Sequence, residues 1–221
     1  DAGLRATPGL IAAALVDDHH VAALIEVRKG SIYLVRGAPP EEGKQWSDAA
    51  PLGAQKATKV TWPRGVLWSE PPPRSRARKP TATPGVFTLS ANLYGLAAAC
   101  AHTGLIYVVR SGATPDFVLQ IPTAEDARIH ALPTREGVLV TVVLGGRSSA
   151  ALHLDERGRV LARRSGYAVA PPLLLGHDRV LWFDHGDDDH ITLLALPDLA
   201  PAGARGHHAY PPVDTALTHR G

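Results

Sequence analysis

The chain has 221 residues, of which 45% are hydrophobic and 20% are charged, and it carries a formal net charge of +2 at neutral pH. This composition is typical of a folded globular protein and excludes wholesale disorder. Because the positive residues are scattered along the chain, the charge predicts neither nucleic acid nor a membrane surface as a partner. At this length we expect a single domain over residues 1–221.

One cysteine, Cys100, occurs in the chain, which excludes an intramolecular disulfide and a cysteine-based zinc site. Its apolar surroundings predict a buried and unreactive thiol. No apolar stretch reaches the length of about 20 residues that a membrane-spanning helix needs, so we expect a soluble chain and favour the cytoplasm. The chain lacks methionine and is rich in Ala, Arg, Pro and Gly, which favours a processed part of a longer product of a GC-rich bacterial gene.

Short apolar runs of Val, Leu, Ile and Ala alternate with Gly, Pro, Asp and Asn along the whole chain, and helical periodicity is weak. This pattern predicts an all-β protein. In chain order we propose five units, each with a polar turn, an apolar run, a second turn and another apolar run. They are "HHVAALIEVRKGSIYLVRG" from His19, "PRGVLWSEPPP" from Pro63, "YGLAAACAHTGLIYVVRSG" from Tyr94, "EGVLVTVVLGGRSSAALHLDERG" from Glu136 and "DRVLWFDHGDDDHITLLALPD" from Asp178.

The units recur along the chain, and the last two intervals carry most of the weight for a period. Their first apolar residues are Val21, Val66, Leu96, Val138 and Val180, which by subtraction lie 45, 30, 42 and 42 residues apart. A period of about 40–45 residues with four short strands per unit is typical of propeller blades. Within the fourth unit, residues 138–144 form a continuous apolar run, which predicts a central strand buried on both faces.

A third strand, a turn ending in glycine and a fourth strand are expected in "AALHLDERGRVLARR", "LIYVVRSGATPDFVLQI" and "SIYLVRGAPPEEGKQWS". In the first of these, Gly158 closes a turn that begins at Asp155, where positive φ is often needed. At these residues the chain resembles the quinoprotein-type and WD40-type β-propeller repeats. The resemblance covers most of the chain. It implies a β-propeller or propeller-like array of about five four-stranded antiparallel blades, or part of a larger ring, with no cofactor.

A basic, proline-rich segment at residues 71–85 separates the second unit from the third. It lacks apolar periodicity, so we expect a loop or linker. Two interpretations stay open, a solvated insertion or a docking segment for an acidic partner. The candidate partner-binding residues are Arg74, Arg76, Arg78 and Lys79.

The acidic stretch "DHGDDDHI" lies at the same place in its unit as "RKGS" and "AHTG" do in theirs, between the second and third strands. A tight turn there explains its Gly and Asp residues. The alternative is a site for a hard cation such as calcium, because carboxylate oxygens are its preferred ligands. The candidate ligands are Asp184, Asp187, Asp189 and His190.

Motifs for catalysis are missing, because the chain has no G-x-S-x-G, no phosphate-binding glycine loop and no H-E-x-x-H. We therefore assign no catalytic residue and expect a non-catalytic interaction scaffold or sensor module of a larger bacterial protein or complex. Its partner would be another protein or another domain of the same polypeptide. The alternative is a propeller-fold hydrolase or lyase acting on a carbohydrate or small metabolite, although Glu26 is the main acid inside an apolar run. Tryptophans at 46, 62, 68 and 182 are expected to fill gaps between blades.

Overall fold

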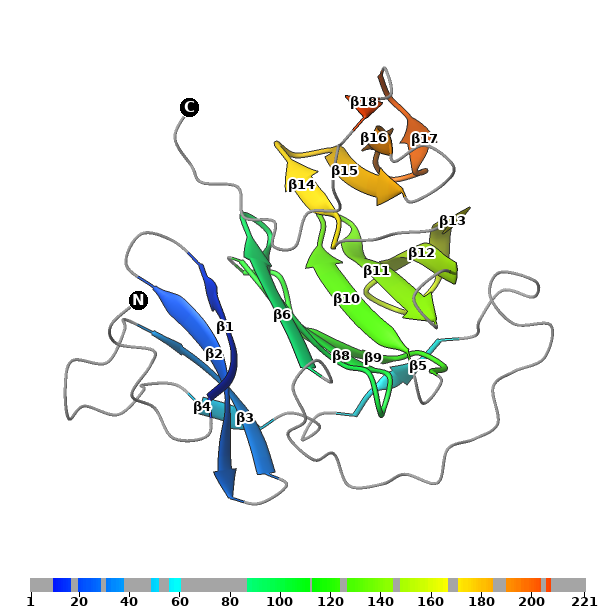
Figure 1. Ribbon diagram of the computed structural model, residues 1–221. Coiled ribbons are helices and arrows are strands. Elements are labelled where there is room, and N and C mark those ends of the chain that lie inside the picture. The colour runs from blue at the N-terminus through cyan, green and yellow to red at the C-terminus, as the bar shows by residue number, and fades with distance from the viewer. Residues whose placement is uncertain are drawn as a thin grey trace.

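The computed structural model describes residues 10–16, 20–28, 31–37, 49–51, 56–60, 87–111, 113–123, 127–144, 148–166, 171–184, 190–203 and 206–207. All regular elements in these ranges are β-strands (Figure 1), so the predicted all-β class is confirmed. Within the same ranges there is no helix long and apolar enough to cross a membrane.

The first half of the described chain forms two antiparallel sheets in which consecutive strands are neighbours. Sheet 1 consists of β1 (Leu10–Leu15), β2 (Val21–Arg28), β3 (Ser31–Gly37) and β4 (Ala49–Pro51). Sheet 2 consists of β6 (Phe87–Asn92), β7 (Gly95–Cys100), β8 (Leu105–Arg110) and β9 (Phe117–Gln120). The short strand β5 (Thr58–Lys59) pairs in parallel with β9 and so extends the outer edge of sheet 2.

The second half repeats this layout. Sheet 3 consists of β10 (Arg128–Pro133), β11 (Gly137–Leu144), β12 (Ser148–Asp155) and β13 (Val160–Gly166). Sheet 4 consists of β14 (Leu173–Leu175), β15 (Arg179–Asp184), β16 (His190–Ala195) and β17 (Ala200–Pro201), and β18 (Gly206–His207) also pairs with β16. Sheets 1 and 4 stand at the two ends of the array in Figure 1.

The strands occur where the repeated units predict them. The second strand of a sheet begins at Val21 in sheet 1 and one residue before Leu96, Val138 and Val180 in the others. The proposed unit around Val66 lies outside the described residues.

Sheets 1 and 2 pack directly on each other, since one hydrophobic cluster joins residues of β2 and β3 to residues of β6, β7 and β8. Among the described residues, no further sheet stands between these two.

The first strands of sheets 2 and 3 lie side by side and run parallel (Figure 1). Polar side chains on alternate residues of β6 donate to backbone carbonyls of β10, each 41 residues further along the chain. Thr88 Oγ1 donates to Ile129 O at 2.7 Å and Asn92 Nδ2 to Pro133 O at 2.8 Å. Between them, Ser90 Oγ donates to Ala131 O. Because the offset is constant, the two sheets are held in one register.

Apolar side chains fill the space between successive sheets. Ala97 and Ala99 of β7 belong to the same hydrophobic cluster as Val138 and Val140 of β11, and all four side chains are buried. Small residues on the middle strand allow adjacent sheets to approach closely.

The prediction for residues 138–144 is confirmed, because β11 lies between β10 and β12 and its residues are buried apart from a half-buried end.

Two further predictions about buried residues are confirmed. Cys100 is a buried, free thiol. Trp182 of β15 is 1% exposed and shares one hydrophobic cluster with Leu139 and Ala151 of sheet 3, so it helps to fill the space between sheets 3 and 4, as expected. The tryptophans at 46, 62 and 68 lie outside the described residues.

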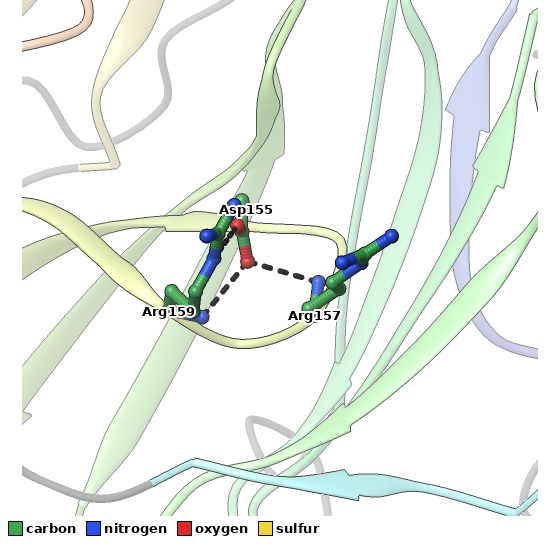
Figure 2. Close-up of polar contacts among 3 residues, drawn as sticks. All are labelled: Asp155, Arg157 and Arg159. Carbon is green, nitrogen blue, oxygen red and sulfur yellow. Dashed lines mark hydrogen bonds and ion pairs between the residues drawn. The ribbon is translucent and has the colours of Figure 1, made fainter.

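Local hydrogen bonds close the turn between β12 and β13 (Figure 2). Asp155 Oδ1 accepts from the backbone N–H groups of Arg157 at 2.9 Å and Arg159 at 2.8 Å, and its Oδ2 accepts from Arg159 Nε at 2.5 Å. Burial raises the pKa of Asp155, but the hydrogen bonds from Arg159 and Arg157 outweigh burial and lower this pKa. Gly158 has φ of 75°, which confirms the predicted turn.

Candidate functional site

Five turns lie at one end of sheets 2, 3 and 4. They join β6 to β7, β8 to β9, β10 to β11, β12 to β13 and β14 to β15, and we call this surface the turn face. All five contribute to a cavity of about 470 Å³. The cavity is lined by Leu93, Tyr94, Arg110, Ser111, Thr114, Phe117, Arg135, Glu136, Glu156 and His177. The fold thus brings together side chains that are up to 84 residues apart in sequence.

A second cavity of about 640 Å³ adjoins the first. It lies between sheets 1 and 2, and residues of both cavities include Arg110, Ser111 and Thr114. Arg36 at the end of β3 lines it opposite the loop between β8 and β9. The turn face therefore has two hollows, one on each side of that loop.

Arg110 connects sheet 2 to the first turn of sheet 3. Its Nη1 donates to the carbonyl oxygens of Thr134 and Gly137, the latter at 3.3 Å, and its Nη2 donates to Arg135 O at 2.6 Å. The backbone N–H of Arg110 donates to Asp116 Oδ1 at 2.9 Å. Since charge-assisted hydrogen bonds are stronger than neutral ones, this guanidinium holds the turn between β10 and β11 firmly.

Tyr94 spans from sheet 2 to sheet 4. Its hydroxyl donates to His177 O at 2.8 Å and lies 3.2 Å from His177 Nδ1, and the two rings meet edge to face. Burial raises the pKa of the Tyr94 hydroxyl, and the nearby Glu136 carboxylate raises it further. The phenol therefore stays protonated and donating at neutral pH.

A buried histidine completes the polar connections of sheet 3. His153 Nδ1 lies 2.8 Å from Pro197 O, and His153 Nε2 lies 2.8 Å from Thr134 Oγ1. Because a carbonyl oxygen only accepts, Nδ1 carries the proton and the neutral Nε2 accepts from the Thr134 hydroxyl. That hydroxyl in turn accepts from Gly137 N–H at 3.1 Å. Sheets 3 and 4 are thus linked by a fully matched network directly below the turn face.

Because sheet 3 contains two histidines with lowered pKa values, we expect the protein to lose stability in mild acid. Burial lowers the pKa of His130 to about 4, helped by the charge of Arg128, and burial also lowers the pKa of His153. The free energy of unfolding keeps its full value above the unfolded-state pKa of about 6.5. It decreases as pH falls toward 4, because the unfolded chain binds more protons than the folded chain in this range. For His130 we expect a loss of about 3 kcal/mol across this window.

Urea unfolding at pH 7.5, 5.5 and 4.5 measures this loss. His130→Leu should flatten the profile over the same range, because the unfolded state then has one proton fewer to bind. A wild-type free energy of unfolding that stays level from pH 7 to 4.5 would contradict the burial of neutral histidines in sheet 3.

Of the residues that the sequence nominated for metal or partner binding, the structure describes only Asp184 and His190. Asp184 and His190 pair across the end of the β15–β16 hairpin, whereas Asp187 and Asp189 lie outside the described residues. The basic candidates Arg74, Arg76, Arg78 and Lys79 also lie outside them. Within the described ranges, no group of three or more His, Cys, Asp or Glu residues could hold a metal ion.

The calcium hypothesis for the acidic hairpin makes a separate prediction. If the segment is only a turn, Asp187→Asn combined with Asp188→Asn removes like charges and should change the free energy of unfolding by less than about 0.5 kcal/mol per residue. Thermal unfolding of both proteins in chelator and in millimolar calcium tests this. A calcium-dependent rise of the midpoint that disappears in the double variant would show a cation site instead.

The sequence reasoning did not identify Arg110, Tyr94, His153 or His177. For Arg110 a signal existed, because "SIYLVRG" and "LIYVVRSG" both end a third strand with arginine, and the two arginines line the same cavity. Comparison with protein-family models and with curated proteins finds no match to this chain. Its function is therefore inferred from the geometry of the turn face.

Proposed function

We propose that the chain is a non-catalytic protein-interaction scaffold or sensor module, built as a propeller-like array of about five blades or as part of a larger ring. Three observations support this arrangement: four sheets with consecutive strand order, second strands of sheets 2, 3 and 4 that start 42 residues apart, and parallel first strands in sheets 2 and 3. The partner would be another protein or another domain of the same polypeptide. The turn face would be the surface that meets it.

One observation carries this proposal, namely that the polar groups in the wall of the turn face already bond to the protein's own backbone. Arg110 donates to three carbonyls and Tyr94 to a fourth, so both side chains form a fixed wall. Around them Arg135, Glu136 and Glu156 are exposed. A rigid wall with a charged rim loses little entropy on binding, which suits recognition of a protein surface.

The rim also offers apolar area. Leu93 is 48% exposed at the tip of the β6–β7 turn, and the half-buried Phe117 lines the same cavity. Protein interfaces combine an apolar centre with a polar rim. We therefore expect a partner that inserts an apolar side chain between these two residues and pairs with the surrounding charges.

The experiment compares two charge reversals on opposite ends of sheet 3. Proteins enriched on the immobilised chain from a bacterial extract would be identified, purified and titrated against wild type, Arg135→Glu and Arg128→Glu. Arg128 is exposed at the far end of β10, so it is the matched control. We expect Arg135→Glu to weaken binding at least tenfold and Arg128→Glu to leave it unchanged. Equal affinities for all three would remove the turn face from the interaction.

A second candidate function is that of a hydrolase or lyase acting on a carbohydrate or small metabolite. The observation in its favour is that Glu136, Glu156 and His177 line one cavity, because glycosidases use paired carboxylates. Hydrolysis of a panel of chromogenic glycosides tests it. Turnover by wild type that Glu136→Gln or Glu156→Gln abolishes would favour the enzyme over the scaffold.

A further inference from the structure

The interface between sheets 3 and 4 contains an unusual row of residues. Cross-strand register places His130, Thr141, Ala151 and Arg164 directly opposite one another on the four strands of sheet 3. Ala151 belongs to the hydrophobic cluster that includes Trp182 of sheet 4, so this row lies on the face that packs against sheet 4. Three of its four residues are polar, which is uncommon in a buried interface.

Several polar atoms at this interface lack a partner. Among the described residues, Thr141 Oγ1, Arg164 Nε and Trp182 Nε1 are buried and have no hydrogen-bond partner in the protein. Thr141 is 0% exposed and Trp182 is 1% exposed, so bulk solvent does not reach either side chain. Buried polar atoms in folded proteins are nearly always hydrogen-bonded, so each of these three atoms calls for an acceptor that the described residues do not supply.

The preceding interface provides the contrast. Between sheets 2 and 3, the polar side chains of Thr88, Ser90 and Asn92 all donate to carbonyls of β10. The same fold therefore matches its inter-sheet donors where protein acceptors are close. At the next interface His153 also finds an acceptor in Pro197 O, whereas Thr141, Arg164 and Trp182 do not, so the difference is local to these three residues.

The chemistry of the three atoms determines what fits between them. Indole Nε1–H and guanidinium Nε–H only donate, and the threonine hydroxyl can donate as well. Arg164 adds a positive charge, whereas the neighbouring His130 is neutral at pH 7 because burial lowers its pKa to about 4. A ligand here must accept hydrogen bonds, favour a positive neighbour and be small enough to be sealed between two packed sheets.

We propose that a halide-sized anion binds between sheets 3 and 4, held by the Thr141 hydroxyl, the Trp182 indole N–H and Arg164. At physiological salt this ion is chloride. It satisfies the three donors, compensates the guanidinium charge and joins two successive sheets. This proposal is independent of the one for the turn face, because the row lies inside the array.

The test compares thermal unfolding in sodium chloride and in sodium gluconate at equal ionic strength. For wild type we expect a saturable rise of the midpoint with chloride, by about 5–10 °C when chloride reaches 100 times its dissociation constant. Thr141→Val removes one donor at nearly constant shape, and Trp182→Phe removes the indole N–H together with part of the ring. Both should lose most of this rise. Thr88→Val is the matched control, since it removes a hydroxyl from the preceding interface and should lower the midpoint equally in both salts.

Crystals of wild type grown in sodium bromide give a direct measurement that requires no variant. An anomalous peak between Thr141 and Trp182 is expected. Equal midpoints in chloride and gluconate, together with no anomalous peak there, would overturn the proposal and leave ordered water as the acceptor. A chloride-dependent rise that both variants retain would place the anion elsewhere and overturn it as well.

Discussion

Val140→Asp is expected to unfold the domain. Val140 lies in the middle of β11, is 0% exposed, and pairs with Ala131 on one side and Leu152 on the other. Its side chain is part of the cluster that joins sheets 2 and 3. A buried carboxylate without a partner costs several kcal/mol, which is a large share of the about 5–15 kcal/mol that stabilises a typical domain. Far-ultraviolet circular dichroism and urea unfolding measure the loss.

Two controls separate the buried charge from other effects. Val140→Ala removes only volume and should cost about 2–4 kcal/mol while the fold is kept. Leu161→Asp introduces the same charge on β13 at a side chain that is 42% exposed, and it should cost less than about 1 kcal/mol. If Val140→Asp kept the wild-type thermal midpoint, β11 could not be the central strand of a packed sheet.

Gly95→Ala is expected to cost about 2–6 kcal/mol, because it combines backbone strain with a collision. Gly95 begins β7 with φ of 132°, a conformation that residues with a side chain rarely adopt. A Cβ atom there would lie 2.1 Å from the carbonyl oxygen of Val109, so the backbone of β8 would have to move. Since Tyr94 and Arg110 flank this point, the turn face would be distorted together with sheet 2.

Gly176→Ala is the control for the strain alone. Gly176 has φ of 61°, and a Cβ atom there would meet nothing within 4 Å, so we expect a cost of only about 1–2 kcal/mol. Urea unfolding of both variants under one set of conditions gives the comparison. Equal costs for the two alanines would mean that the close approach of β7 to β8 is not rigid.

The positions of the strands follow from local sequence. Runs of apolar residues bounded by polar turns place the starts of β7, β11 and β15 at Gly95, Gly137 and Arg179, at intervals of 42 residues. A strand with both faces buried needs apolar side chains on every residue, and this requirement is visible without knowing its neighbours. The turn at Asp155 is equally local, because its hydrogen bonds reach no further than four residues.

Local sequence does not show which strands become neighbours in space. Residues 58–59 form β5 and pair in parallel with β9, about 60 residues later, although nothing in so short a segment indicates that partner. Likewise, sheets 1 and 2 pack directly on each other, and the repeat spacing does not indicate this contact. Strand pairing over such distances depends on the chain's path through loops, which local patterns do not encode.

The polar chemistry was decided by the tertiary structure alone. Arg110 donates to carbonyls 24–27 residues away and His153 lies against a carbonyl 44 residues away, and a backbone carbonyl has no sequence signature. The sequence also does not show that the donors of Thr141 and Trp182 lack an acceptor. In an apolar run each resembles an ordinary core residue, and only the packing of sheet 4 on sheet 3 leaves it without an acceptor. By itself the sequence determined an array of β-strands and its period, because these depend on each strand's own side chains. The candidate binding groups were decided by the tertiary structure, because each depends on whether a neighbouring sheet supplies a hydrogen-bond partner.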